Sequence, residues 1–426
     1  MHPGWWVGLA ELAVMNSHWS VFCVVQPYFF AHSHLHRRKI DALRAAGFRA
    51  RGVSFVPERL FSKHVDRYRA AQKSGYMEIV RVRSEAAVNR ALFIFFAWRL
   101  LTGRRVVAHV LRCDPTPLLR LRKVWLLGRR LRIVLEHEGD QSAEYVYDRT
   151  FSEDSLPAEE PPAELRATYQ AMFNEQAAQV TQADGLVLMS DEHVSLWENR
   201  LGHTVRAVVV PTLFDPATPG FMPEARTQVR AELGIADKAV LVYAGNVVCK
   251  WQRFETMCRF VARLQRQRES VWFLGLVRMD DLGLANDIVA RSGIAAISTI
   301  VSVPSMEVMR YLSAADVALF LRHEHSMNTI VTSAKLGEYL AAGLPVISTG
   351  ANANVLNRFM REQGVGLFVP DTLELPADFA EQFAHLLTRA GHAHWRQAVS
   401  AATLRRFSGA GDPLKKYCEF IRELAA

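Results

Sequence analysis

The stretch SAKLGEYLAAGLPVI, residues 333–347, has the pattern of a short helix that leads into a buried strand. Ser333 precedes the periodic residues, and we expect it to cap the helix N-terminus because its hydroxyl can accept an amide hydrogen bond there. Gly343 is expected to end the helix, since glycine readily adopts the left-handed conformation found at helix ends. The residues predicted to form the buried face recur at helical spacing: Leu336, Tyr339 and Leu340.

A lysine and a glutamate lie on a different face of this predicted helix. Lys335 belongs to its first turn and Glu338 follows three residues later, so the two side chains are neighbours. A helix N-terminus after a strand-to-helix loop attracts anions, and a lysine in the first turn strengthens this attraction. A glutamate one turn further on can accept both hydroxyls of a ribose, as acidic residues do in dinucleotide-binding folds. The spacing fits equally well a solvent-exposed Lys–Glu pair of little energetic weight.

A second informative stretch is VYAGNVVCKWQ, residues 242–252. It predicts a strand, a tight turn at Gly245 and Asn246, and then Lys250 at the entrance to a helix. A glycine in such a turn lets the backbone approach a ligand closely, and a lysine can meet a phosphate as a point charge. The motif is weak on its own, because it lacks both the GxGxxG pattern and the Walker spacing.

The surrounding chain alternates between apolar runs and amphipathic stretches. In the second half, the runs predicted as buried parallel strands are Val240–Ala244, Val271–Leu276, Asp316–Leu321, Pro345–Ser348 and Gly366–Val369. The predicted helices there include Gln252–Gln267 and Ser305–Ala314. The first half repeats the theme with candidate strands Val21–Val25, Ala50–Val56, Val106–Val110, Arg132–His137, Gly185–Met189 and Ala207–Val210, and with a helix at Arg37–Ala46. This alternation favours parallel sheets covered by helices, whose ligands bind beyond the carboxyl ends of the strands.

The length of 426 residues indicates two domains, and a proline-rich stretch separates them. Four prolines between Pro211 and Pro223 can continue neither a helix nor a central strand. We therefore expect one Rossmann-like domain at residues 1–211, a linker at 212–224 and a second Rossmann-like domain at 225–400. A C-terminal helix within 401–426 is expected to pack back toward the first domain.

Taken together, these segments resemble the GT-B glycosyltransferases of the family four type, also called glycosyl transferases group 1. KLGEYLAAGLPVI resembles the donor-site helix of that family. YAGN followed by Lys250 resembles its first C-domain strand and its phosphate-binding lysine, RAELGI (230–235) the segment before that strand, and AADVALFLR (314–322) the strand that leads to the sugar-binding loop. The resemblance covers about residues 230–370 closely and the first half in outline.

The resemblance implies an α/β fold of the GT-B type, with two doubly wound Rossmann-like domains facing a central cleft, the first on the acceptor side. It implies transfer of a sugar from a nucleotide diphosphate sugar to a hydroxyl of a glycan or lipid-linked acceptor, in cell-surface polysaccharide or glycoconjugate synthesis. It also implies retention at the anomeric carbon, with no metal and no cofactor. Glu338 would hold the donor ribose and Lys250 the diphosphate. The other donor-site positions that match are Gly245, Asn246, Arg322 and Lys335.

The chain departs from the family pattern at two positions and leaves two alternatives open. Ile330 stands where the family often has a glutamate, and Asn246 where an arginine is common. A catalytically lapsed nucleotide-binding scaffold is one alternative, and these departures favour it. The other is a GT-B epimerase acting on a nucleotide sugar, which needs paired acid/base carboxylates, for which Glu136 and Glu138 are the candidates.

The stretch VLEHEGD, residues 134–140, resembles the His-Gly loop on the acceptor side of the same family. His137 or Glu138 would then orient the acceptor hydroxyl or the donor sugar. The alternative is a polar strand end with solvated acids. A metal site at the alternating histidines 32, 34 and 36 is disfavoured because no carboxylate or cysteine is close in sequence, and HEH at 323–325 is too tight for the HExxH zinc motif.

Charge is distributed unevenly, although the net charge is only +8. Residues 37–132 contain 24 Lys and Arg against 6 Asp and Glu, and within them cations and bulky apolar side chains interleave at 118–132. That segment is either a solvated basic face or a surface that meets an anionic membrane or an acidic acceptor. Nucleic-acid binding is disfavoured because no recognition motif accompanies the charge.

The remaining features indicate a reducing compartment and no membrane span. Five scattered cysteines without a CxxC pair fit the cytoplasm, with peripheral association at the inner face of the membrane as an extension. The apolar stretch Trp5–Met15 carries Glu11 and lacks a basic flank, so it is a poor signal peptide, and either Met1 or Met15 can be the start.

Overall fold

The computed structural model describes residues 19–27, 33–153, 155–212, 218–267, 270–349, 355–372, 374–407 and 412–426. The predictions for Trp5–Met15, for His32 and for the middle of the proline-rich stretch lie outside these residues. The described chain divides into two units. The first lies within Met1–Glu138, Gln170–Asp215 and Gly409–Ala426, and the second within Gly139–Tyr169 and Pro216–Ser408.

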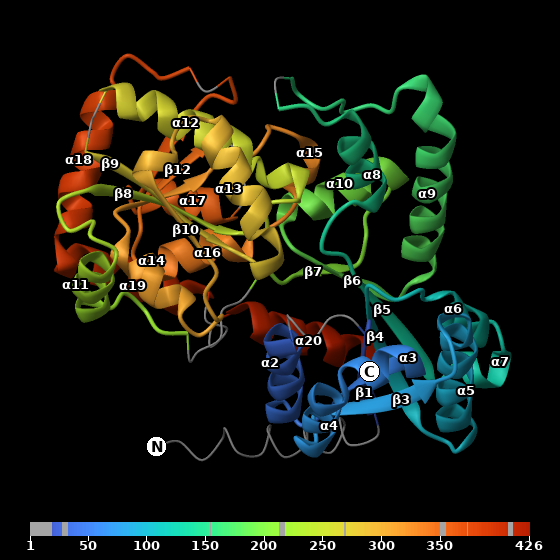
Figure 1. Ribbon diagram of the computed structural model, residues 1–426. Helices are drawn as coiled ribbons and strands as arrows, with labels where there is room; N and C mark the ends of the chain where they lie inside the picture. The colour runs from blue at the N-terminus through green and yellow to red at the C-terminus, as the bar shows by residue number, and fades with distance from the viewer. Residues whose placement is uncertain are drawn as a thin grey trace, which may run out of the picture. The chain divides into compact units, whose positions relative to one another are not determined.

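The first unit is a seven-stranded parallel sheet with the strand order β3-β2-β1-β4-β5-β6-β7 (Figure 1). Its strands are β1 (Trp19–Val25), β2 (Arg49–Pro57), β3 (Met77–Val82), β4 (Arg105–Leu111), β5 (Leu131–Glu136), β6 (Gly185–Leu188) and β7 (Ala207–Val209). Its helices are α2 (Ser33–Ala45), α3 (Glu58–Lys63), α4 (Val65–Lys73), η2 (Glu85–Ala87), α5 (Val88–Leu101), α6 (Thr116–Arg122), α7 (Trp125–Gly128), α10 (Asp191–Leu201) and α20 (Asp412–Ala425). The unit boundary falls within α9 (Ala163–Gln182).

Helices cover both faces of this sheet, because its central strands are apolar on both sides. In β1, Val21 and Cys23 belong to the core beneath α2 and α20. Phe22 and Val24, which alternate with them, belong to the core beneath α5 and α6. The last helix is tied to the sheet by a polar contact, since the hydroxyl of Tyr417 lies 2.8 Å from Nδ1 of His109 in β4.

The second unit is a six-stranded parallel sheet with the order β10-β9-β8-β11-β12-β13 (Figure 1). Its strands are β8 (Ala239–Gly245), β9 (Val271–Val277), β10 (Ser298–Val301), β11 (Val317–Phe320), β12 (Val346–Thr349) and β13 (Gly366–Val369). Its helices are α8 (Gln141–Thr150), α11 (Pro223–Glu232), η3 (Lys250–Gln252), α12 (Phe254–Gln267), η4 (Met279–Asp281), α13 (Leu282–Arg291), η5 (Ala295–Ile297), α14 (Val308–Ala314), α15 (Ser326–Thr329), α16 (Ala334–Ala341), α17 (Val355–Glu362), α18 (Phe379–Gly391) and α19 (Ala393–Phe407).

The strands predicted from apolar runs are confirmed, with ends that differ by one or two residues. Two strands were not predicted, β3 and β10, and both form an edge of their sheet. An edge strand is only partly buried, so its sequence does not need a continuous apolar run. In β3, for example, Glu78 and Arg81 interrupt the pattern. Within the part of the chain that the structure describes, no helix has the length and apolar composition needed to cross a bilayer.

The helix predicted from residues 333–347 is α16, and Gly343 lies just beyond it with φ of +68°. A Cβ atom at this position would overlap the backbone carbonyl of Arg396 in α19. We therefore expect Gly343→Ala to destabilise the protein by about 2–3 kcal/mol, because it combines left-handed strain with a clash against rigid backbone. Chemical denaturation checks this, and Gly391→Ala is the control because a Cβ atom added there would meet nothing within 4 Å. Equal stability of the two variants would contradict the argument.

Candidate functional site

The site lies where the strand order of the second sheet reverses. β8 comes first in sequence, β9 and β10 add on one side of it, and β11, β12 and β13 add on the other. In doubly wound sheets, ligands are expected at such a point, beyond the carboxyl ends of the two neighbouring strands, here β8 and β11. Gly245 ends β8, and Arg322 follows β11.

Lys335 of α16 reaches the end of β8 and lies against Gly245. The glycine has φ of +150°, and a Cβ atom there would overlap Nζ of Lys335. The same Nζ lies 3.3 Å from the hydroxyl of Tyr243 and 5.2 Å from the centroid of its ring. Glycine at this position is thus what allows the ammonium group to approach the strand end. The structure brings together Gly245 and Lys335, which are 90 residues apart in the sequence.

The electrostatics of this corner favour an anion. Burial, together with the nearby Arg322, lowers the pKa of Lys335 to about 7. Burial likewise lowers the pKa of Arg322, to about 10. Burial raises the pKa of Glu338, although Lys335 opposes that shift. Two cations held in a low-dielectric environment gain more from a bound anion than exposed cations would.

Tyr339 attaches α16 to β8. Its hydroxyl accepts a hydrogen bond from the backbone NH of Ala244 at 2.8 Å, so the helix is attached one residue before Gly245. The expected buried face is confirmed, with Leu336, Tyr339 and Leu340 all at 1% exposure or less. The prediction that the Ser333 hydroxyl caps the helix is wrong. Ser333 occupies the N-cap position but makes no capping hydrogen bond with its side chain, and its hydroxyl instead lies 3.4 Å from the Arg322 guanidinium.

Asn246 and Lys250 shape the loop after β8. The Asn246 side chain accepts hydrogen bonds from the backbone NH groups of Val248, at 2.9 Å, and Cys249, at 3.3 Å, so it holds its own turn. Lys250 donates a hydrogen bond to the backbone carbonyl of Asp148 in α8, and its Nζ lies 3.4 Å from the Asp148 carboxylate. Lys250 is partly exposed, unlike Lys335.

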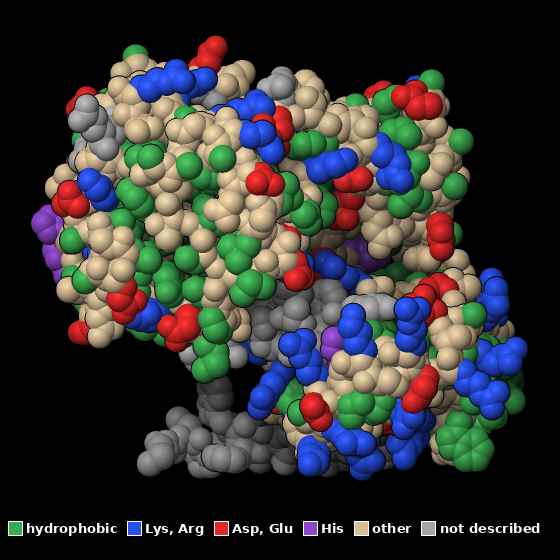
Figure 2. All heavy atoms as spheres, viewed as in Figure 1, with side chains coloured by type: hydrophobic (Ala, Val, Ile, Leu, Met, Phe, Trp, Pro, Cys, Tyr) green, Lys and Arg blue, Asp and Glu red, His purple; other side chains and the backbone are tan. Residues whose placement is uncertain are grey.

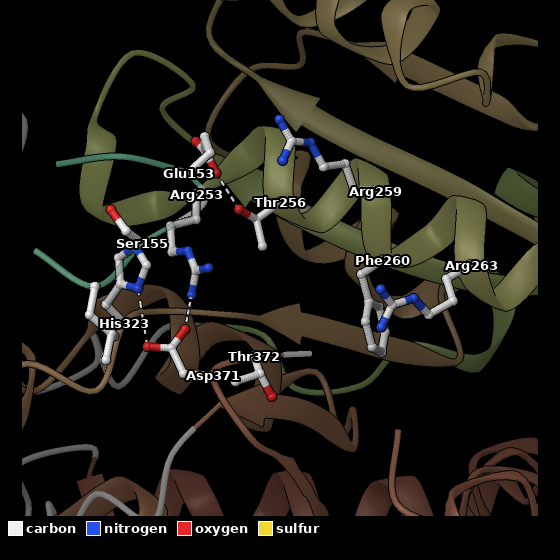
Figure 3. A pocket seen from close by; sticks show the side chains of 11 residues that line it. Glu153, Ser155, Arg253, Thr256, Arg259, Phe260, Arg263, His323, Asp371 and Thr372 are labelled. Atoms are coloured by element: carbon white, nitrogen blue, oxygen red, sulfur yellow. Dashed lines mark hydrogen bonds and ion pairs between the residues drawn. The ribbon is translucent and has the colours of Figure 1, made fainter. Parts of the chain in front are cut away.

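A pocket of about 350 Å³ lies beside this loop, lined by residues of α12, of the loops after β11 and β13, and of the segment after α8 (Figure 3). At its base Asp371 pairs with the buried guanidinium of Arg253 and with Nδ1 of His323. Burial would raise the pKa of Asp371, but the His323 hydrogen bond and Arg253 hold it below its ordinary value. Thr256 donates to Glu153 at the rim.

Sequence reasoning missed Asp371. The sequence feature that could have identified Asp371 is its position directly after Pro370, at the carboxyl end of a predicted strand. His323 and His325, set aside as too tight for a zinc motif, have separate roles. His323 binds Asp371, and Nδ1 of His325 accepts a hydrogen bond from the NH of Met327 at the start of α15.

In the first unit, the carboxyl end of β5 carries His137 and Glu138. His137 is half-buried, with its ring centroid 5.5 Å from that of Trp197 in α10. Glu138 pairs with Arg112, which follows β4, and burial raises the pKa of Glu138 despite that cation. These two residues lie where a ligand of a parallel sheet is expected.

Glu136 lies beneath them in a buried cluster. It pairs with Lys39 of α2, and its second oxygen lies 2.9 Å from Nε2 of His109. Burial would raise the pKa of Glu136, but Lys39 and the His109 hydrogen bond hold it well below its ordinary value. Glu136 is thus engaged with Lys39 and His109 inside the fold, whereas Glu138 lies at the strand end, and this difference disfavours the two as an acid/base pair.

A comparison with protein families matches the part of the chain that carries this strand-end geometry. Residues 238–389 match the family model described as glycosyl transferases group 1. The matched segment runs from β8 to α18 and so contains every position that the sequence analysis predicted for a donor site. The resemblance stated from the sequence is therefore confirmed. A search of curated proteins finds no match.

Solved structures match this chain over nearly its whole length. A glycosyltransferase from Rickettsia africae is 12% identical, with a TM-score of 0.63 and coverage of 96% of this chain and 99% of that one. Anabaena HepE in complex with UDP-glucose is 13% identical, with a TM-score of 0.60 and coverage of 95% and 99%. WaaG, a glycosyltransferase involved in lipopolysaccharide biosynthesis, is 15% identical, with a TM-score of 0.58 and coverage of 94% and 99%. At such identities the likeness shows the fold, which is GT-B.

Ile330 is one of the two positions at which the sequence departs from the pattern of the family that it resembles. Ile330 is 3% exposed and follows α15. The position where the family often has a glutamate is therefore filled by a buried aliphatic side chain.

Proposed function

We propose that this protein transfers a sugar from a nucleotide diphosphate sugar to a hydroxyl of a glycan or lipid-linked acceptor, in cell-surface polysaccharide or glycoconjugate synthesis. The observation that carries the proposal is the Lys335 ammonium, buried against Gly245 at the switch point of the second sheet. A departing diphosphate is the chemical species that such a preorganised cation stabilises.

Each donor-site residue has a proposed role. Lys335, with the backbone NH groups at the start of α16, stabilises the diphosphate as negative charge develops on it. Glu338 accepts hydrogen bonds from the ribose hydroxyls. Arg322 contacts phosphate or sugar, and Gly245 and Asn246 shape the turn beneath them. Lys250 adds a second cation from the β8 loop. We propose that these cations make the reaction independent of metal and cofactor, with retention at the anomeric carbon.

The acceptor half of the reaction is assigned to the first unit. His137 and Glu138 orient the acceptor hydroxyl or the donor sugar from the end of β5. Burial raises the pKa of Glu138, which favours the protonated form that a general acid needs. We place the reaction in the cytoplasm, at the inner face of the membrane, where a lipid-linked acceptor would be presented.

A thermal-shift series with UDP, GDP, ADP, TDP and CMP, each with and without a chelator, tests the donor site. A nucleotide at about 100 times its Kd should add roughly 2.7 kcal/mol and raise the Tm by several degrees. We expect a shift with one nucleotide that persists in the chelator. We also expect Glu338→Ala to lose it, because charge-assisted hydrogen bonds to the ribose disappear.

The matched control is Glu362→Ala, which removes an exposed carboxylate from α17 in the same unit. This variant should keep the shift. If the protein melts cooperatively and none of the nucleotides raises its Tm, the proposal is wrong and the catalytically lapsed scaffold remains. A response that Glu338→Ala retains in full would remove Glu338 from the ribose site.

A further inference from the structure

The helix α5 is apolar on both its faces, which is unusual at the surface of a protein. Leu92, Phe95, Phe96 and Leu100 face the sheet and are buried. The opposite face carries Ile94 at 58% exposure, Trp98 at 67% and Leu101 at 67%. These three lie at i, i+4 and i+7, so they form one continuous stripe. A helix that is hydrophobic all round is normally covered on every side.

A second exposed apolar group lies beside this stripe. The short helix α7 packs against α5 and α6, and it presents Trp125 at 66% exposure and Leu126 at 68%. Its C-terminal end is attached to that of α5, since Arg130 donates a hydrogen bond to the carbonyl of Leu100 at 3.2 Å. Figure 2 shows apolar and basic side chains together over α5 and α7. We call these residues, with Val124, the α5–α7 patch.

The two segments that carry the α5–α7 patch have charge of one sign, and the acids beside them include Glu78, which pairs with Arg99 of α5, and Glu85 before α5. Residues 88–105 and 116–132 contain 10 Lys and Arg and no Asp or Glu. The exposed cations among them are Arg90, Arg104, Arg105, Arg120, Lys123, Arg129 and Arg130. The guanidinium of Arg129 lies 4.5 Å from the centroid of the Trp125 ring, so cation and aromatic side chain are presented together. The complementary partner is therefore both apolar and anionic.

We propose that the α5–α7 patch docks the protein on an anionic lipid bilayer. Tryptophan, leucine and isoleucine enter the boundary between headgroups and acyl chains, and the surrounding cations meet anionic headgroups. A second copy of the same face would bring like charges together, which disfavours it as the occupant. The inference rests on the proposed function for the membrane location and deepens it, because it names the docking surface and assigns a role to α5, a helix outside the basic segment 118–132.

Vesicle co-sedimentation of the full chain, without nucleotide, tests the proposal. The wild type should sediment with vesicles containing phosphatidylglycerol and stay in solution with pure phosphatidylcholine. Lys123→Gln and Arg129→Gln should each weaken binding about fivefold, since one basic contact is lost each time. The double variant Trp98→Gln, Trp125→Gln should remove most of the binding. Raised salt should weaken binding by the wild type, because exposed charges are screened.

Met306→Gln is the matched control, since Met306 is 87% exposed but belongs to the second unit. It should bind as the wild type does. Absence of binding to anionic vesicles, or equal binding by the tryptophan variant, overturns the proposal. Sedimentation velocity identifies the rival occupant, because a dimer that the tryptophan variant abolishes would assign the patch to a second copy. The thermal-shift response to nucleotide should be unchanged in the tryptophan variant, which separates this test from that of the proposed function.

Discussion

Lys335→Met is expected to abolish nucleotide diphosphate binding while leaving the protein at least as stable at pH 7 as the wild type. The variant removes the buried ammonium that lies against Gly245 and keeps an unbranched chain of similar volume. Loss of a buried cation that pairs with the diphosphate should cost about 2–5 kcal/mol of binding free energy. Calorimetric titration with the nucleotide found in the thermal-shift series, together with denaturation, measures both effects. Lys238→Met, a substitution elsewhere in the same unit, should change neither.

The stability half of this prediction follows from the lowered pKa of Lys335. Its value of about 7 in the folded protein lies below the value of about 10.4 in an unfolded chain. Between these values the unfolded state binds more protons, so the free energy of unfolding of the wild type rises with pH across that window. Below about pH 7 the cost of burying the cation is present in full. Methionine avoids that cost, so the stability advantage of the variant should be largest at low pH.

The pH dependence of binding separates a ligand-binding lysine from a structural one. An anion that stabilises the charged form raises the pKa of Lys335, so binding at about pH 8 should take up about one proton. The affinity should then fall roughly tenfold per pH unit above about pH 8. Titrations in buffers of different ionisation enthalpy measure the uptake, and Lys335→Met should lack it. Binding by that variant with wild-type affinity would place the diphosphate elsewhere.

Lys250→Ala is expected to lower kcat/KM, with a loss of about 2–4 kcal/mol of transition-state stabilisation. This is the effect of removing one hydrogen-bond donor that points at the leaving group. Lys250 contacts the Asp148 carbonyl and carboxylate, and we propose that the donor phosphate replaces both contacts. The effect should therefore appear in turnover more than in the stability of the free protein. Donor hydrolysis or transfer assays measure it once the nucleotide is known.

Asp148→Asn is the informative companion to this variant. It removes the carboxylate but keeps the backbone carbonyl that Lys250 also contacts. Turnover should stay near that of the wild type, because no proposed donor contact is lost. Near-normal turnover in Lys250→Ala would remove Lys250 from the donor site. An equal loss in Asp148→Asn would show that Lys250 acts through α8 and not on the phosphate.

The parts of the fold that follow from local pattern could be predicted. Central strands such as β8 and β9 are buried on both faces, so their sequences are continuous apolar runs. The helix α16 was found because its periodicity, its closing glycine and its Lys–Glu spacing all lie within residues 333–347. The edge strands β3 and β10 were not predicted, because they are only partly buried and their sequences therefore contain no continuous apolar run.

The sequence by itself determined the α/β class, the order of the elements and the residues available at the candidate site. Only the tertiary structure decided what those residues do. It gave Lys335 a lowered pKa by burying it beside Tyr243, it engaged Glu136 with Lys39 and His109, and it joined Asp371 to Arg253. It also set the exposed stripe of α5 beside α7. Secondary structure is encoded by neighbours along the chain, whereas burial and charge pairing depend on residues far apart in sequence, which meet only when the sheets form.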